Sequence, residues 1–91
     1  MAGDYQTLQI GPEFMESFAS ADFSASDRRR FLRALRLLDT DERHPSLRVH
    51  QLEGNLAGLW SASASDVLRM TFERLPSGRK RMRTCSRHYD R

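Results

Sequence analysis

The sequence has one cysteine, no run of apolar residues long enough to span a membrane, and no internal repeat or low-complexity segment. The single cysteine, Cys85, excludes an intramolecular disulfide framework and a cysteine-rich metal site, and a reducing cytosol is the natural compartment for such a chain. A membrane helix needs roughly 20 apolar residues, and the first residues lack the basic and apolar regions of a signal peptide. We therefore expect a cytoplasmic protein with no membrane partner.

The 91 residues suffice for one small hydrophobic core, so residues 1–91 are expected to form a single domain. Charge is divided unevenly along the chain. Residues 1–46 contain six basic and eight acidic residues, whereas residues 47–91 contain nine basic and four acidic ones. A basic C-terminal half predicts a polyanion or an acidic protein as its partner.

The N-terminal half is predicted to be one strand followed by two helices. Residues 5–10 alternate like a short strand, and Gly11-Pro12 ends the strand and opens a helix that reaches residues 20–22. The segment Ser24 to Asp27 resembles a capping box and predicts a longer helix to about Asp39. The buried stripe of this longer helix is expected to be Phe31, Ala34, Leu35 and Leu38.

Three arginines lie opposite that stripe at helical spacing, Arg29, Arg33 and Arg36. This pattern is typical of a solvated helix surface, and docking to an acidic partner is the alternative.

From His44-Pro45 onward the period changes from helical to alternating, which predicts strands at residues 48–52, 59–63, 67–73 and 79–86. Leu68, Met70 and Phe72 alternate with polar residues, so Arg69 is expected to face away from them. The fold class predicted is α+β, with two N-terminal helices packed on one face of a curved, mainly antiparallel sheet.

Residues 44–61 (HPSLRVHQLEGNLAGLWS), 66–70 (DVLRM) and 85–89 (CSRHY) resemble the RelE/ParE toxin superfamily, and the YoeB-like branch is the most similar. The resemblance implies a RelE-like β-α-α-β-β-β order. It also implies the toxin of a type II toxin-antitoxin system, acting as a ribosome-dependent mRNA endoribonuclease (mRNA interferase) that inhibits translation. The implied partners are an antitoxin encoded nearby, the ribosome and mRNA, with a homodimer or a toxin-antitoxin hetero-oligomer both open.

The same resemblance implies four catalytic residues. Arg69 matches the family's phosphate-stabilising arginine, and His88 and Tyr89 match its terminal histidine-tyrosine pair. His50 stands where YoeB-like toxins place a glutamate proposed as general base. Other branches of the superfamily have a histidine in this region, and an imidazole can perform that task.

The chain also departs from its relatives. Positions that often carry lysines in relatives read Gln51, Glu53, Asn55 and Ala57, which reduces the charge expected to face the ribosome. Asp90-Arg91 extends beyond the tyrosine at which many relatives stop.

These residue types suffice for RNA cleavage without a metal or cofactor. The reaction needs a base for the 2′-hydroxyl proton, cations around the phosphate oxygens and an acid for the leaving oxygen. We assign His50 as base, His88 as acid and Arg69 as phosphate clamp, while Tyr89 offers a ring for base stacking.

Further RNA-binding candidates are Arg48, Arg81, Arg83 and Arg87. Cys85 and Trp60 are interpreted as packing residues.

Two other functions remain open at this point. One is a binding protein, either a ParE-like gyrase poison or a RelE-like fold without catalysis. The other is a basic RNA-binding domain, suggested by the run Arg79-Lys80-Arg81 with Arg83. Retention of His50, Arg69, His88 and Tyr89 favours the nuclease.

Overall fold

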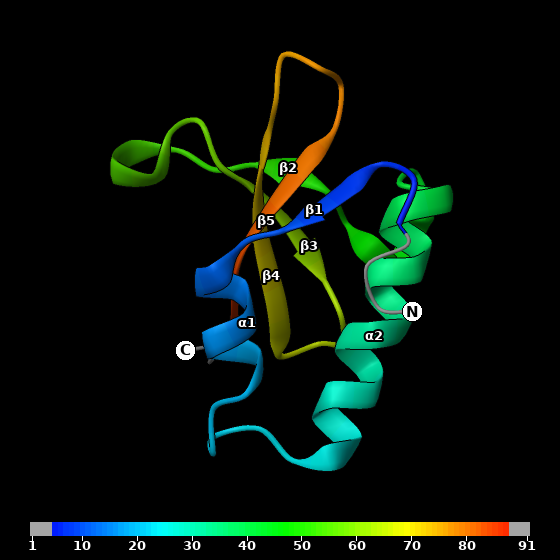
Figure 1. The fold of residues 1–91 in the computed structure, drawn as a ribbon, viewed down its shortest axis with the longest axis vertical. Helices are drawn as coiled ribbons and strands as arrows, with labels where there is room; N and C mark the ends of the chain where they lie inside the picture. Colours follow the sequence, from blue (N-terminus) through cyan, green and yellow to red (C-terminus); the bar gives the residue numbers. More distant parts are fainter. Residues whose placement is uncertain (1–4, 88–91) are drawn as a thin grey trace.

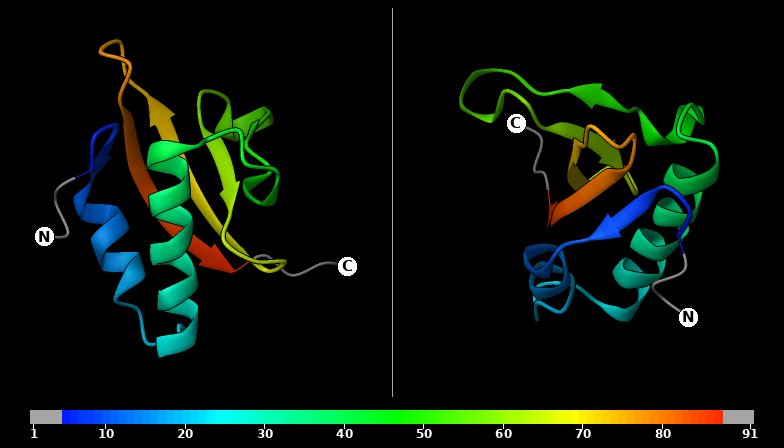
Figure 2. Two further views of the ribbon diagram at one scale, coloured as in Figure 1. Left: turned by 90° about the vertical axis from the view of Figure 1, so that its right-hand side faces the viewer. Right: turned by 45° about the horizontal axis from the view of Figure 1, so that its top comes forward.

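A computed structural model describes residues 5–87, in which two helices cover one face of a five-stranded sheet (Figures 1 and 2). The chain order is β1 (Leu8–Ile10), α1 (Pro12–Phe18), α2 (Ala25–Thr40), the 3₁₀ helix η1 (Pro45–Leu47), β2 (His50–Gln51), the 3₁₀ helix η2 (Gly54–Leu56), β3 (Trp60–Ser63), β4 (Leu68–Arg74) and β5 (Lys80–Arg87). The strands lie in the order β1-β5-β4-β3-β2, and only the β1-β5 pair is parallel. The α+β class and the mainly antiparallel sheet are confirmed.

The strand predicted at residues 48–52 is wrong in its extent, because β2 contains only His50 and Gln51. Arg48 ends η1 with φ 47°, in the left-handed region, so it cannot extend the strand toward its N-terminus. Four strands follow the helices within residues 5–87, as the alternating segments predict, which is one more than the β-α-α-β-β-β order that the resemblance implies. The additional strand is β2, a short edge strand whose connection to β3 projects beyond the sheet (Figure 1).

The capping box that opens α2 is confirmed. The hydroxyl of Ser24 accepts from the Asp27 N–H at 3.0 Å, and the Asp27 carboxylate accepts from the Ser24 N–H at 3.0 Å. Two backbone donors at the helix start are thereby satisfied, which stabilises the end of α2 that lies against β5.

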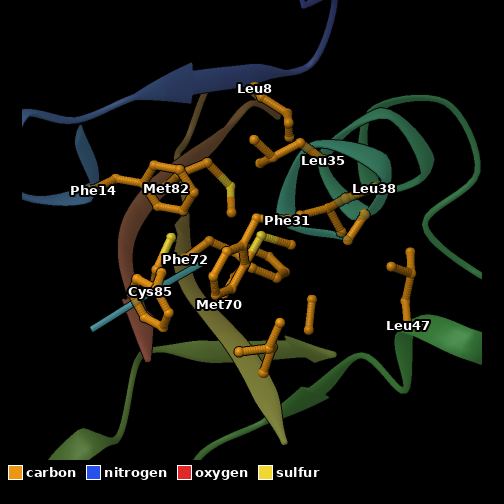
Figure 3. Packing of buried hydrophobic residues seen from close by; sticks show 14 residues of the cluster. Leu8, Phe14, Phe31, Leu35, Leu38, Leu47, Met70, Phe72, Met82 and Cys85 are labelled. Carbon is orange, nitrogen blue, oxygen red and sulfur yellow. The ribbon is translucent and has the colours of Figure 1, made fainter. Parts of the chain in front are cut away.

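The hydrophobic core lies between the helices and the sheet (Figure 3). The α2 stripe is buried as predicted, and it packs against the inward side chains of β4 and β5. On β4 these are Leu68, Met70 and Phe72, each no more than 1% exposed. Because side chains alternate along a strand, Arg69, Thr71 and Glu73 belong to the opposite face. We call that opposite, helix-free side of the sheet the open face.

Asp39, near the end of α2, holds the N-terminal strand in place. Its carboxylate accepts hydrogen bonds from the N–H groups of Gln6 at 3.1 Å and Thr7 at 2.6 Å, and from the Thr7 hydroxyl at 2.8 Å. Burial alone would raise the pKa of Asp39, but the hydrogen bonds from Thr7 and Gln6 outweigh it and hold the pKa below its ordinary value.

None of the helices in the part of the chain that the structure describes is long and apolar enough to cross a membrane.

We predict that Asp39→Asn lowers the free energy of unfolding by about 1–2 kcal/mol at pH 7, because an acceptor oxygen becomes an amide that faces N–H donors. The pKa of Asp39 is lower in the folded state, so its contribution is complete above the unfolded pKa, about 3.9. That contribution is lost as the pH falls through the folded value. The difference between wild type and variant in urea unfolding should therefore shrink from pH 7 to pH 3.

Asp41→Asn is the matched control, since Asp41 is exposed and close to Asp39 in the chain. Equal pH dependence of the two variants would contradict this role for Asp39.

Candidate active site

The strand register places His50 and Arg69 on the open face. His50 lies opposite Ser61 of β3, and Arg69 of β4 lies opposite Ser63 of β3 and Ser86 of β5. Ser61 in turn lies opposite Thr71, whose side chain is on the open face as well. Directly paired residues project to the same side of a sheet, so the six side chains share one face.

The separation between His50 and Arg69 follows from this register. They are two strands apart, at about 4.8 Å per strand, and two residues apart along the strand direction, about 6.6 Å, so their Cα atoms are roughly 12 Å apart. The hydroxyl side chains of Ser61 and Ser63 lie on the strand between them.

The His50 ring is oriented by the backbone. Its Nδ1 lies 2.8 Å from the carbonyl oxygen of Arg48. Because a carbonyl oxygen can only accept, Nδ1 carries the proton and donates it. In the neutral ring, Nε2 then has a free lone pair on an exposed side chain. His50 is therefore in the tautomer that a general base requires.

His44 has the opposite arrangement. Its Nδ1 accepts from the Ser46 N–H at 3.2 Å and lies 2.8 Å from the Ser46 hydroxyl, so it caps η1. The ring nitrogen is used in holding the loop, which agrees with a structural role for His44.

Arg69 is half-buried, and its guanidinium is turned toward the β3-β4 turn. Nη1 donates to the carbonyl oxygen of Ser65 at 2.7 Å and to that of Leu68 at 3.2 Å. Among residues 5–87, Nε and Nη2 of Arg69 have no acceptor, and no carboxylate pairs with the guanidinium. Arg69 is thus positioned by neutral acceptors and keeps both its charge and two donor groups for an anion.

Arg87 does not lie with these residues. It is opposite Leu68, so it belongs to the helix face, where its Nη2 donates to the Asp27 carboxylate at 2.6 Å and its guanidinium lies 5.9 Å from the centre of the Phe23 ring. The Ser24 N–H and the Arg87 ion pair together hold the pKa of Asp27 below its ordinary value, against the effect of desolvation. The structure thus places Arg87 on the other side of the sheet from Arg69, where its charge joins β5 to the start of α2, and its role in RNA binding stays a prediction.

Arg81 and Arg83 are also neutralised. Arg81 pairs with Glu73 at 2.9 Å, and Arg83 pairs with Glu73 at 3.3 Å and with Glu13 at 3.0 Å. Arg48 differs, since its exposed side chain forms no ion pair with any residue from 5 to 87. Of the four arginines predicted to bind RNA, Arg48 is the one placed beside His50 with its charge free.

His88 and Tyr89 lie outside the described residues, so their predicted catalytic roles stay predictions. They follow Arg87, the last residue of β5, directly in the chain. Within residues 5–87, no three His, Cys, Asp or Glu side chains gather closely enough to hold a metal ion.

The sequence did not reveal the backbone carbonyls of Arg48 and Ser65 that orient the two candidate catalytic side chains. Both belong to tight turns, one with a left-handed residue and one in which the Ser65 hydroxyl accepts from the Leu68 N–H at 3.1 Å. A serine three residues before a strand residue is a weak turn signal. No sequence pattern marks the left-handed conformation of an arginine.

Cys85 is buried, and burial raises the pKa of its thiol to about 12 although the Ser17 hydroxyl acts in the opposite direction. We predict that a thiol-reactive disulfide reagent labels the native protein at pH 8 far more slowly than the chain unfolded in guanidinium. The unfolded chain should release one equivalent of the reagent's leaving thiolate per chain. Rapid labelling of native protein would contradict the packing role.

No protein-family model and no curated protein matches this sequence. Several solved structures match in fold. The YoeB/ParE toxin from Agrobacterium tumefaciens is 19% identical with a TM-score of 0.65, over 91% of this chain and 99% of that chain. The toxin-antitoxin complex DinJ-YafQ of E. coli gives 14% identity and a TM-score of 0.70, over 89% of this chain and 90% of that chain. A YoeB dimer from Staphylococcus aureus is 16% identical with a TM-score of 0.60, over 91% of this chain and 97% of that chain. The resemblance read from the sequence is therefore confirmed in the fold, and this chain has the fold of the YoeB, ParE and YafQ toxins.

Proposed function

We propose that this chain is the toxin of a type II toxin-antitoxin pair and cleaves mRNA on the ribosome, in the cytoplasm. The observation that carries the proposal is the His50 ring, held by the Arg48 carbonyl, on the same open face as the Arg69 guanidinium, which pairs with no carboxylate of residues 5–87. Neither a gyrase poison nor a simple RNA-binding domain requires an oriented imidazole beside an unpaired arginine.

The reaction assigned to these residues is an internal transesterification. Nε2 of His50 takes the proton of the 2′-hydroxyl, and the 2′-oxygen forms a bond with the adjacent phosphorus. The bond from phosphorus to the 5′-oxygen breaks, and His88 donates a proton to that oxygen. The products are a 2′,3′-cyclic phosphate and a 5′-hydroxyl, and the protein's side chains supply every proton transfer.

Arg69 stabilises the charge that develops on the phosphate oxygens. Its guanidinium is held by two carbonyl oxygens rather than by a carboxylate, so no internal anion has to be displaced when a phosphate binds. Tyr89 is assigned to stacking on an unpaired base, which every nucleobase allows.

An antitoxin is the expected protein partner. The structures with this fold include the DinJ-YafQ toxin-antitoxin complex and a YoeB-YefM complex from Staphylococcus aureus. For this chain, an acidic antitoxin segment would be attracted to the open face, where the guanidinium of Arg69 pairs with no carboxylate of residues 5–87.

The first test replaces His50 by Asn, whose amide can still donate to the Arg48 carbonyl but cannot accept a proton. We predict that His50→Asn lowers the single-turnover rate of mRNA cleavage on programmed ribosomes by about 10²-fold or more. Arg69→Lys keeps the charge but loses the planar fork, and it should lower the rate by a similar factor.

His44→Asn and Arg29→Gln are the matched controls, because the first retains a capping acceptor and the second changes an exposed arginine of α2. Both should cleave at the parent rate. If His50→Asn is folded and also cleaves at the parent rate, His50 is not the base.

The second test removes the nucleophile from the substrate. An mRNA with 2′-deoxyribose at the cleaved nucleotide should resist cutting completely, because the 2′-oxygen is the attacking atom. Cleavage of the ordinary mRNA should leave a 2′,3′-cyclic phosphate or the 3′-phosphate derived from it, which mass spectrometry distinguishes. Cleavage of the deoxy substrate would assign the attack to water.

Arrest of replication with trapped gyrase, without mRNA cleavage, would favour the ParE-like alternative.

A further inference from the structure

A polar cavity of about 590 Å³ lies beside β3, next to the candidate active site. Its position follows from the shortness of β2, which pairs only with Trp60 and Ser61. The following residues of β3 therefore have no strand on that side in the described part of the chain. The cavity lies between one stripe of α2, the η1 segment and the β3-β4 turn, and its polar lining includes Arg30, Arg33, Arg48, Ser46, Ser65 and Asp66.

The charge of this lining is strongly positive, with three arginines from two segments and one aspartate. Arg33 and Arg48 form no ion pair within residues 5–87. Arg30 approaches Asp27 only at 3.9 Å, and Asp27 already pairs with Arg87 at 2.6 Å. Like charges that converge around a concave surface focus the field there and attract an anion.

Neither His50 nor Arg69 lines the cavity, but each donates a hydrogen bond to the backbone carbonyl of a residue that does. His50 donates to the carbonyl of Arg48, and Arg69 donates to the carbonyl of Ser65, and both of these carbonyls belong to cavity-lining residues. The Ser65 hydroxyl accepts from the Leu68 N–H, which leaves its own proton available to a ligand. The cavity thus shares Arg48 and Ser65 with the two turns that orient the candidate catalytic side chains.

We propose that this cavity binds a backbone phosphate of the RNA that flanks the cleaved phosphate. The inference rests on the proposed function, since a strand cleaved between His50 and Arg69 must continue past the site on both sides. Planar guanidiniums match phosphate oxygens in pairs, and several of them suit a phosphate that carries charge on two oxygens. Arg33 then becomes a positioning residue for RNA, distinct from its helix neighbours Arg29 and Arg36, which do not line the cavity.

The test is binding of a short single-stranded oligoribonucleotide, followed by fluorescence anisotropy over a range of salt concentrations. We predict that Arg33→Gln raises the Kd roughly three- to fivefold. The slope of log Kd against log salt should fall by about 0.7 for the lost phosphate contact. Arg29→Gln, on the same helix but outside the cavity, should leave both quantities unchanged.

A modified oligonucleotide locates the contact. Replacing one flanking phosphate by a neutral methylphosphonate should weaken binding to the wild type at one position only and should not weaken binding to Arg33→Gln further. The proposed subsite is overturned if no methylphosphonate position weakens binding to the wild type alone, or if Arg29→Gln weakens binding as much as Arg33→Gln. Binding would then be due to the diffuse positive field of the protein. Displacement of the RNA by polyglutamate in the wild type but not in Arg33→Gln, with no methylphosphonate effect, would assign the cavity to an acidic protein segment.

The binding measurement is independent of cleavage, so the two proposals can fail separately. If Arg33→Gln changes RNA binding as predicted but His50→Asn cleaves at the parent rate, the phosphate subsite stands and the catalytic assignment is wrong. If His50→Asn is inactive but Arg33→Gln binds RNA like the wild type, the subsite is overturned and the nuclease stands.

Discussion

The placement of the candidate site depends on the burial of one side of β4. Leu68, Met70 and Phe72 are fully buried beneath the helices, and the two-residue period of a strand then directs Arg69 to the open face. A shift of register by one residue would bury the guanidinium and expose the three apolar side chains, so the core itself excludes that arrangement. Hydrophobic packing on one side of the sheet thus fixes the chemistry available on the other.

The uneven charge of the two halves of the chain does not produce a uniformly basic C-terminal half in the folded protein. Most basic residues of the C-terminal half pair with acidic residues, several of them from the N-terminal half. Glu42 lies between Arg74 at 2.6 Å and the buried Lys80 at 3.2 Å, and these partners hold the pKa of Glu42 below its ordinary value. The excess charge is therefore not spread over the basic half. Within the basic half, Arg48, Arg69 and Arg79 form no ion pair with any residue from 5 to 87, and Arg33 adds such a charge on the cavity side of α2.

The sequence could predict what depends on period and local hydrogen bonding. The α2 stripe, the Ser24 capping box and the orientation of Arg69 all follow from residues close together in the chain. The sequence could not predict that Arg87 pairs with Asp27, because the two residues are 60 positions apart and meet only when β5 packs beside α2. For the same reason, the sequence could not distinguish the environment of Arg33 from that of Arg29. Both have helical spacing on the exposed side of α2, and only the position of η1 and the β3-β4 turn makes one of them line a cavity.

His50, the proposed general base, is held in a fixed orientation although its edge strand has only two residues. So short a strand contributes little pairing of its own, but Leu47 just before it is completely buried and fixes η1 against the core. The left-handed turn at Arg48 then reverses the chain so that its carbonyl meets the imidazole two residues later. The orientation of the imidazole is therefore set by the burial of a leucine and the conformation of one arginine. The two residues of β2 suffice here because the hydrophobic contact of Leu47 with the core, rather than the backbone hydrogen bonds of the sheet, holds this segment in place.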